Sequence, residues 1–395
     1  MIKTLNLAST LPLDMPDALL IGRVWVHGPS GAGPVLVLVT ASDVYDLSSL
    51  AATASQLLEL PDPAQAVRAA APSLPRLADT AAVLANSTAD ARNPGLPWLL
   101  APCDLQAIKA AGVTFVASML ERVIEEQAGG DASKAESVRA AVVSVMGDNL
   151  TCIKPGSPEA AKLKEVLIAQ GVWSQYLEVG IGPDAEIFTK SQPLSAVGSG
   201  AEIGIHPHSH WNNPEPEIVL AVNSRGTVVG ATLGNDVNLR DFEGRSALLL
   251  GKAKDNNASC AIGPFIRLFD EHFNIDHVRL SDLVMTVAGP EGFEMTGGSS
   301  LRLISRDPLD LVAQAINANH QYPDGFMLFL GTMFAPTQDR HGPGQGFTHV
   351  VGDLVVVSTP QLGSLVNRVT TSDRAEPWTF GLAALMHSLA RRGLL

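Results

Sequence analysis

The feature that most constrains the fold is the chain from residue 175 onward, where short β-like runs follow one another with turns between them. These runs include YLEVGIG, AEIFTK, TVVGATL, LRLIS, FMLFLGT and DLVVVSTP. Few helical patterns interrupt them, and the strand–helix–strand alternation of a parallel sheet is missing. Such a succession is typical of a curved β structure such as a roll or a sandwich. We therefore expect an α+β chain in which β structure dominates.

The length and the turn signals predict two domains. A chain of 395 residues is too long for one compact core. Residues 20–48 alternate β-like runs with Gly and Pro turns, and residues 50–92 are alanine-rich with a helical pattern. A cluster of Asn, Pro and Gly at 93–97 marks the boundary. We expect a small α+β domain over residues 1–95 and a larger domain over residues 96–395.

Composition excludes several classes of partner. The net charge is −13 and no basic run with interleaved aromatic residues is present, so nucleic acid is not an expected partner. No stretch approaches the ~18 apolar residues of a membrane helix, and the N-terminus lacks the pattern of a signal peptide. The three cysteines form no CxxC motif, which indicates reduced thiols. We expect a soluble, cytoplasmic protein.

Two glutamates, Glu215 and Glu217, lead into the apolar strand IVLAV. Residues two apart on a strand share a face. The turn NSRG then leads into TVVGATLGND, which predicts a hairpin. With a symmetrical loop of two or four residues, Glu217 faces Thr232 and Glu215 faces Gly234. Asp236 then lies diagonal to Glu215, on the face that carries both glutamates.

Three carboxylates on one face raise one another's pKa unless a cation neutralises them. An all-oxygen ligand set suits a hard divalent ion, with Mg²⁺ the first candidate and Mn²⁺ or Ca²⁺ as alternatives. Three protein ligands leave coordination positions open for a substrate, which indicates a catalytic site. The alternative is a solvated sheet end with ordinary surface acids.

Two further groups of residues are ambiguous on their own. Lys252 and Lys254 follow an apolar run and share a face if the strand continues. A lysine with a lowered pKa can act as a base, but a lysine at a strand end with its amine in solvent explains the pattern equally well. His206, His208 and His210 alternate and could hold zinc. The prolines around these histidines favour a polar loop instead.

The segment over residues 104–128 predicts one or two helices. Thr114, Ser118, Glu121 and Glu125 follow helical spacing and form a polar stripe. A solvated helix face is the simplest interpretation of this stripe.

The chain resembles the fumarylacetoacetate hydrolase family. The resemblance rests on PEPEIVLAV, GNDVNLRD, GKAKDNNASCAIGPFI, FLGT, and GDLVVV with LGSLVNRV, in this order between about residues 100 and 370. It implies a mixed β-roll catalytic domain preceded by a smaller N-terminal domain, in a homodimer or a dimer of dimers. It also implies that Glu215, Glu217 and Asp236 are the metal ligands.

The resemblance implies roles for residues around the metal as well. Lys252 fits the family's catalytic lysine best, and Lys254 is a close competitor because the alignment before NNA is ambiguous. Arg240 and Asp241 match the family's RD pair. Thr332 matches the threonine of the GT block, which resembles a contact to the substrate carboxylate.

One departure points to a branch of the family. Hydrolytic members carry a histidine that activates water, but GVTFVASMLERVIEE has none and places Glu121 near the expected position. This segment, with YLEVGIGPDAEIFTK and HQYPDG, is most similar to sugar-acid dehydratases. The similarity implies Mg²⁺-dependent dehydration of a 2-keto-3-deoxypentonate, from xylonate or arabonate, to 2-oxoglutarate semialdehyde in non-phosphorylative pentose degradation.

Under this interpretation the polar stripe is a wall of the active site. Glu121 protonates the departing hydroxyl, and Ser118 contacts the substrate. The alternative function is a hydrolase that cleaves a C–C bond of a 2,4-dioxo acid on the same metal. A catalytically silent sugar-acid binding protein is a third possibility, against which the acidic triad and the lysine count.

Overall fold

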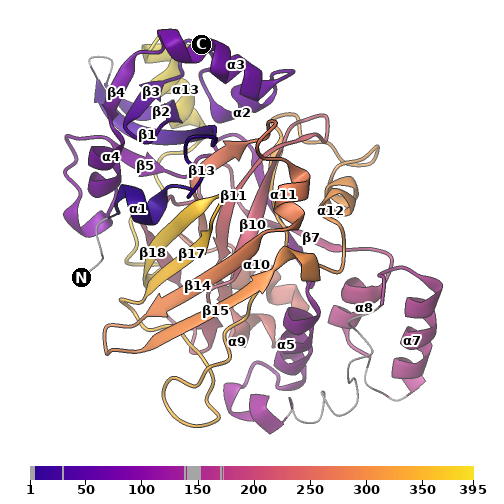
Figure 1. Cartoon of the computed structure of the whole chain (residues 1–395). Helices are drawn as coiled ribbons and strands as arrows, with labels where there is room; N and C mark the ends of the chain where they lie inside the picture. The colour runs from indigo at the N-terminus through magenta and orange to yellow at the C-terminus, as the bar shows by residue number, and fades with distance from the viewer. Residues whose placement is uncertain (1–4, 29–30, 138, 140–152, 170, 172) are drawn as a thin grey trace.

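A computed structural model of the chain describes residues 5–28, 31–137, 139, 153–169, 171 and 173–395. Two sheets and a set of short helices build the molecule (Figure 1). β structure dominates, which confirms the predicted α+β class.

The larger sheet is mixed and has eleven strands, in the order β4-β3-β2-β1-β13-β11-β10-β16-β6-β7, with β5 paired to β1. Its strands are β1 (Leu20–Gly28), β2 (Gly31–Val39), β3 (Asp43–Asp46), β4 (Arg76–Asp79), β5 (Trp98–Leu100), β6 (Ala107–Gly112), β7 (Glu186–Ser191), β10 (Pro216–Val222), β11 (Val228–Asp236), β13 (Cys260–Leu268) and β16 (Phe326–Phe329). All residues of β10 and β13 are buried. A strand covered on both faces carries a continuous apolar run, which explains the composition of IVLAV.

The smaller sheet has five strands in the order β15-β14-β17-β18-β8. These strands are β8 (Glu202–Ile205), β14 (Asp282–Ala288), β15 (Glu294–Ser300), β17 (Leu354–Thr359) and β18 (Gly363–Thr371). β18 contacts β13, and β17 contacts β11, so the two sheets curl over a shared core. Figure 1 shows β14 and β15 in front of β10 and β11. A short pair, β9 (Asn212–Asn213) and β12 (Asn238–Leu239), completes the strands.

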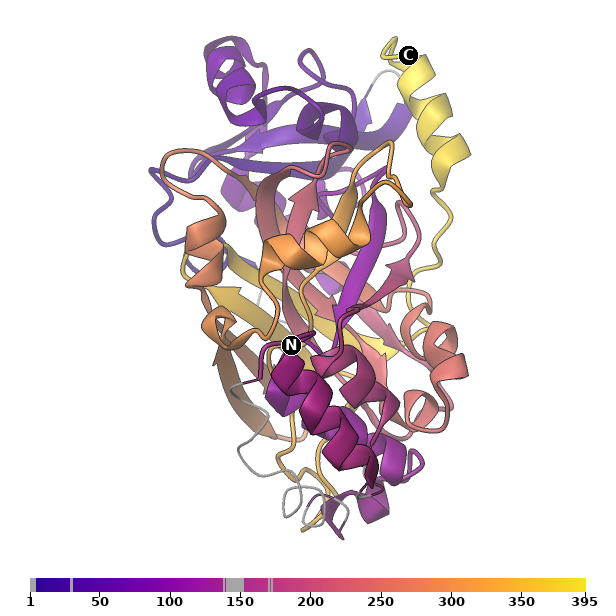
Figure 2. The ribbon, with the colours of Figure 1, turned by 90° about the vertical axis from the view of Figure 1, so that its right-hand side faces the viewer.

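The helices lie around these sheets. They are α1 (Leu7–Thr10), α2 (Ala54–Leu58), α3 (Pro63–Ala70), α4 (Thr80–Asn86), α5 (Val116–Gln127), α7 (Pro158–Ala169), α8 (Gln175–Ile181), α9 (Arg240–Glu243), α10 (Leu250–Lys254), α11 (Ile275–Arg279), α12 (Pro308–Ala315) and α13 (Leu382–Arg391). Helices α5, α7 and α8 gather at the end of the molecule away from β1–β4 (Figures 1 and 2). In the described part of the chain, no helix has both the length and the apolar composition that crossing a bilayer requires.

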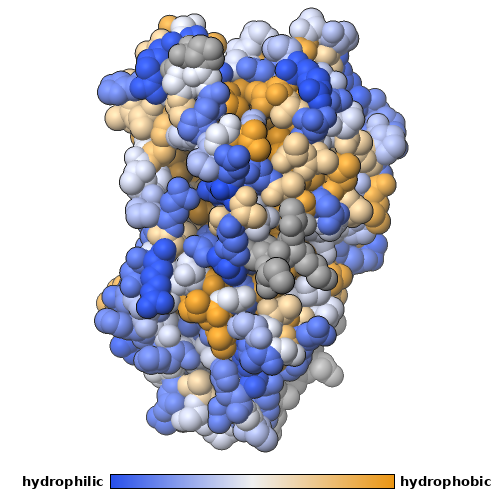
Figure 3. Space-filling view, turned by 90° about the vertical axis from the view of Figure 1, so that its left-hand side faces the viewer, coloured by the Kyte–Doolittle hydropathy of each residue, from blue (hydrophilic) through white to orange (hydrophobic). Residues whose placement is uncertain are grey.

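Two of the predicted strands are wrong. YLEVGIG forms helix α8, because the Ser174 side chain caps its start by accepting a hydrogen bond from the Tyr176 N–H. LRLIS forms a single 3₁₀ turn over Leu301–Leu303. The face shown in Figure 3 is a mosaic in which hydrophilic side chains separate the hydrophobic patches.

The first 95 residues share a sheet and a core with the rest of the chain. β1 pairs with β13 at Leu20 and Arg267. Buried Ile21 lies in the same apolar cluster as Ile262 and Phe329. The predicted boundary at 93–97 therefore lies between segments that belong to the same sheet and share the same apolar cluster.

Candidate metal and active site

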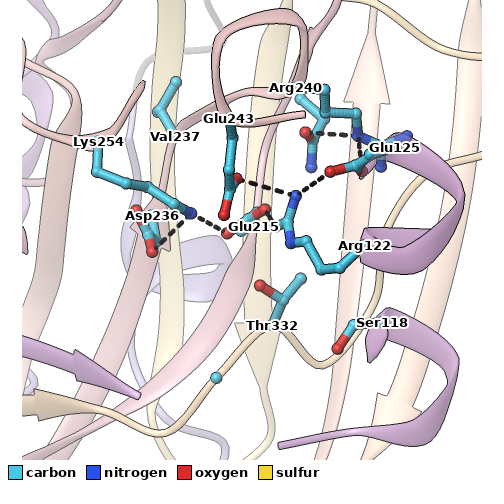
Figure 4. A network of polar contacts seen from close by, with 12 residues as sticks. Ser118, Arg122, Glu125, Glu215, Asp236, Val237, Arg240, Glu243, Lys254 and Thr332 are labelled. Atoms are coloured by element: carbon cyan, nitrogen blue, oxygen red, sulfur yellow. Dashed lines mark hydrogen bonds and ion pairs between the residues drawn. The ribbon is translucent and has the colours of Figure 1, made fainter. Parts of the chain in front are cut away.

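Glu215, Glu217 and Asp236 come together at the open end of the β10–β11 hairpin, and Figure 4 shows Glu215 and Asp236 there. Each offers a carboxylate oxygen, and these oxygens lie within 4.8 Å of one another. The three residues are at most 2% exposed. The structure thus brings together the three ligands that the sequence singled out.

The hairpin pairs its strands in a register that differs from the predicted one. Glu217 lies opposite Gly234, and Glu215 lies directly opposite Asp236, whose N–H donates to the Glu215 carbonyl at 2.9 Å. The predicted register is two residues out because the loop, 223–227, is longer than expected and a bulge follows it. A shift of two residues keeps every side chain on its face, so the carboxylates still meet.

Three cationic side chains contact this triad. Lys254 Nζ lies 2.6 Å from Glu215 Oε2 and 3.1 Å from Asp236 Oδ2. Lys190 Nζ lies 2.8 Å from Asp236 Oδ1, and Arg122 of α5 pairs with Glu215 from the other side (Figure 4). Burial opposes ionisation, but Lys190 and Lys254 hold the pKa of Asp236 below its ordinary value.

Glu217 has no such partner. Its carboxylate accepts from the Gly331 N–H at 2.6 Å and from Thr332 Oγ1 at 3.4 Å, and it contacts no cationic side chain among the described residues. Burial, together with the charge of Asp236, raises the pKa of Glu217 well above its ordinary value. A cation beside Glu217 would remove that penalty.

The charge of the whole cluster also fits a divalent ion. Six carboxyl groups gather in it, against four cationic side chains: Glu125, Glu186, Glu215, Glu217, Asp236 and Glu243 against Arg122, Lys190, Arg240 and Lys254. Burial raises the pKa of Glu186 to about 7, and with this group protonated the other five carboxylates, if ionised, leave one negative charge without a partner, in surroundings where unpaired charge is costly. The hard oxygen donors and this charge together support a divalent metal site.

A small cavity of about 10 Å³ adjoins the triad. Its walls come from β6, β7, α5, α9, α10 and the two strands of the hairpin. The lining residues are Ala111, Gly112, Val113, Ser118, Arg122, Glu186, Phe188, Glu215, Glu217, Asp236, Glu243, Lys254 and Thr332. Ser118 and Thr332 therefore lie beside the triad, around a space with room for about one water molecule.

The structure places Lys254, and not Lys252, at the triad. The segment around Lys252 and Lys254 was expected to form a strand, but it forms helix α10. Residues two apart on a helix point in nearly opposite directions. Lys252 is exposed, with its amine 5.2 Å from the centre of the Phe242 ring. Of the two candidate lysines, Lys254 is the one that contacts the triad.

Glu121 does not line the cavity. Its carboxylate pairs with Arg139 at 2.7 Å. Because α5 begins only at Val116, the residues that face the triad are Ser118 and Arg122, and Glu121 lies about 100° away from Arg122 around the helix. Glu121, the predicted proton donor, therefore points toward Arg139 and not into the cavity.

Arg240 and Asp241 also lie outside the cavity. The Arg240 guanidinium is buried and contacts Glu125 Oε1 at 3.2 Å and Asn213 Oδ1 at 2.8 Å. Asp241 accepts from Ser209 Oγ at 2.7 Å and so anchors the loop before β9. Both residues support the walls of the site from behind.

Two residues of β7 that lie at the site, Glu186 and Lys190, were not predicted from the sequence. Glu186 lines the cavity, and its carboxyl group lies so close to Gly112 that a Cβ there would sit 1.8 Å from Oε2. Desolvation raises the pKa of Glu186 to about 7, and the charge of Glu243 adds to the effect. Lys190 lies four residues after Glu186 on the same strand, so the two side chains point to the same face of the sheet. The alternation of side chains in AEIFTK is the one sequence feature that could have paired them.

None of the ten histidines, all of which lie in the described part of the chain, lines the cavity. His206 and His208 lie on the loop after β8, as the prolines predicted. His349 is buried and its Nδ1 lies 2.8 Å from Asp353 Oδ2. The triad therefore lacks a histidine that could activate water beside it.

Val113 marks the turn from β6 into α5 with a left-handed backbone, φ 57°. A β-branched residue in this conformation is strained. The strain falls in the wall of the cavity, where it sets the direction in which α5 presents Ser118 and Arg122.

Comparison with known proteins relates the chain to one family. Residues 178–370 match the fumarylacetoacetate (FAA) hydrolase C-terminal family. A 2-dehydro-3-deoxy-D-arabinonate dehydratase of Saccharolobus solfataricus is 30% identical over 184 residues, which are 47% of this chain and 58% of the relative. A probable 2-keto-3-deoxyxylonate dehydratase of Haloferax volcanii is 30% identical over 196 residues, 50% of this chain and 64% of the relative. The chain thus matches less than two thirds of each relative's length.

Solved structures share the fold over nearly the whole chain. A 2-keto-3-deoxy-D-arabinonate dehydratase complexed with magnesium and 2,5-dioxopentanoate superposes with a TM-score of 0.58 and 20% identity, covering 90% of this chain and 100% of that one. The fumarylacetoacetate hydrolase of Exiguobacterium antarcticum gives a TM-score of 0.52 with 16% identity over the same shares.

Proposed function

We propose that this chain, whose residues 178–370 match the fumarylacetoacetate hydrolase C-terminal family, is a metal-dependent dehydratase of 2-keto-3-deoxy sugar acids. The substrate we propose is a 2-keto-3-deoxypentonate, and the product is 2-oxoglutarate semialdehyde, which is 2,5-dioxopentanoate. The observation that carries the proposal is the presence of a buried acidic triad, a lysine and a carboxyl group with a raised pKa in one cavity without a histidine. The names of the relatives support the same chemistry.

Glu215, Glu217 and Asp236 would hold the metal, for which Mg²⁺ is the first candidate and Mn²⁺ or Ca²⁺ are alternatives. When bound, such an ion polarises the 2-oxo group of the substrate and makes the C3 hydrogens more acidic. Among the described residues no lysine or arginine forms an ion pair with Glu217, so of the three ligands its charge depends most on the ion.

A metal ion on Glu215 and Asp236 would take over these carboxylates from the Lys254 ammonium. The Lys254 amine, once it has lost its proton, is then placed to take one from C3, because it reaches the triad from helix α10. Glu186 donates its proton to the C4 hydroxyl, whose bond to carbon breaks as water leaves. The electrons of the C3–H bond form the new C3–C4 double bond. Proton redistribution along the chain then gives the 2,5-dioxo acid, so that the only atoms lost are those of water.

We assign the proton donor to Glu186 in place of Glu121. Glu186 lines the cavity and holds its proton near neutral pH, whereas the Glu121 carboxylate is occupied by Arg139. Ser118 and Thr332 are proposed to contact the substrate, and Arg240 and Asp241 to support the site. The C–C hydrolase alternative requires an activated water, and the cavity offers no histidine for that role.

The test is a substrate panel with and without EDTA. Purified protein is incubated with 2-keto-3-deoxy pentonates of both C4 configurations, with a 2-keto-3-deoxy hexonate and with a 2,4-dioxo acid. We expect EDTA-sensitive release of 2-oxoglutarate semialdehyde from a pentonate. Cleavage of the 2,4-dioxo acid without any dehydration would overturn the proposal. A cytoplasmic location and a homodimer or dimer of dimers stay predictions.

A further inference from the structure

A second cavity, of about 310 Å³, shares no lining residue with the metal site. It lies between β1, β5, the segment 194–201 and the linker that leads from β18 to α13. Figure 2 shows this linker as an extended segment that runs along the side of the molecule up to α13. We propose that the cavity, which we call the aromatic groove, binds a neutral monosaccharide.

Aromatic rings form the walls of the groove. Trp25 and Trp98 are cross-strand neighbours, and their rings stack with centroids 5.9 Å apart. Phe380 meets the edge of Trp25 at 5.1 Å, and Trp378 lines the groove while 46% of it is exposed. The half-exposed Trp378 indole leaves apolar area that a ligand in the groove would cover with a favourable free energy. The flat C–H face of a sugar ring is a cover of matching shape and polarity.

Polar groups beside these rings have unused hydrogen-bonding capacity. The Arg92 guanidinium lies 5.0 Å from the centre of the Trp98 ring, and its buried Nε has no partner among the described residues. Asn257 lines the groove and donates its amide N–H groups to the Ser372 and Glu376 carbonyls, and no described residue donates to its Oδ1. Hydroxyl groups both accept and donate, so one ring of hydroxyls can satisfy both residues.

Charge and size narrow the ligand further. Arg92 pairs with Glu376 at 3.3 Å, so opposite charges cancel within the groove. This balance favours a neutral ligand over a sugar acid or a phosphate. A volume of about 310 Å³ is at the lower end of the range for small-molecule pockets, roughly 300–1,000 Å³, which fits one sugar ring. The inference does not depend on the proposed dehydratase function, because it uses different residues.

The experiment uses tryptophan fluorescence and calorimetry on the full chain. D-xylose, L-arabinose and D-glucose are titrated, with D-xylonate as a charged analogue of similar size. We expect a saturable signal with millimolar affinity for at least one neutral sugar and weaker binding of xylonate. Trp378→Ala is expected to weaken sugar binding by at least about tenfold. Circular dichroism checks that this variant keeps its fold.

Trp173→Phe is the matched control, because Trp173 is also partly exposed with a cation over its ring but lies outside the groove. It should bind the sugar as the wild type does. A groove that binds none of the sugars, that prefers xylonate, or that binds equally well in Trp378→Ala would overturn the proposal. So would a change in oligomeric state on Trp378→Ala without any sugar binding, since the groove would then be a subunit contact.

Discussion

At the residue scale, the proposed acid chemistry rests on the single carboxyl group of Glu186. Desolvation raises its pKa to about 7, so this group is protonated below that pH and loses its proton as the pH rises through it. A reaction that needs the protonated form therefore slows as the pH rises through about 7. The measurement is the pH dependence of kcat, in which this step is expected on the alkaline side.

Glu186→Gln tests the assignment directly. The amide keeps the shape but cannot donate a carboxyl proton, so we expect kcat to fall by roughly 10²–10⁴-fold and the alkaline step to disappear. Glu121→Gln is the matched control, because its carboxylate pairs with Arg139 away from the cavity. A large loss in Glu121→Gln with near-normal Glu186→Gln would reverse the two roles.

The two lysines of α10 provide a second matched pair. Lys254 contacts Glu215 and Asp236, whereas Lys252 is exposed. Lys254→Met is expected to lower kcat by roughly 10²–10⁴-fold, and Lys252→Met to leave it within a few-fold of the wild type. Steady-state kinetics at saturating metal make the comparison, with circular dichroism as the check on folding. Equal losses in both variants would contradict the placement.

At the element scale, the hairpin explains why the triad could be predicted from the sequence. Side chains on a strand repeat every two residues, so Glu215, Glu217 and Asp236 meet even though the real register differs by two. The lysines could not be assigned because a strand and a helix orient Lys252 and Lys254 differently, and a run of five residues does not distinguish them.

The positions of Glu186 and Lys190 beside the triad could not be predicted from the sequence for another reason. β7 joins the sheet through β6, far along the strand order from β10 and β11, and nothing local in AEIFTK links it to the hairpin. Arg122 shares a face of α5 with Ser118, four residues before it, but helical spacing alone did not show that this face meets Glu215. Contacts between distant segments decide these positions, and periodicity reports only on a single segment.

The close packing of β11 against its neighbours gives an element-scale prediction. A Cβ at Gly234 would lie 2.2 Å from Phe329 and 2.6 Å from Val219, so Gly234→Ala should lower the free energy of unfolding by about 1–3 kcal/mol. Gly251→Ala in α10 meets nothing within 4 Å and should raise it by up to about 1 kcal/mol. Urea unfolding of both variants measures this. The opposite order of stability would contradict the packing.

At the scale of the whole molecule, a single sheet contains strands from both sides of the predicted domain boundary. Removing residues 1–95 would expose the edge of β13 and strip buried partners such as Ile21 from the cluster around Ile262. We expect residues 96–395 expressed alone to aggregate or to lack cooperative unfolding, as measured by light scattering and thermal circular dichroism. A soluble fragment with a sharp unfolding transition would instead support two independent domains.

The proposed dehydratase chemistry depends on a divalent ion held by the triad, and titration of the full chain with Mn²⁺ by calorimetry and electron paramagnetic resonance tests for this ion most directly. Glu217→Gln is the informative variant, because it removes the one ligand charge that no lysine or arginine contacts and leaves the other ion pairs in place. We predict one tight Mn²⁺ site per wild-type chain, competed by Mg²⁺, and a loss of at least about a hundredfold in affinity for the variant. A wild-type chain that binds no ion, or a variant that binds as tightly as the wild type, would contradict the account.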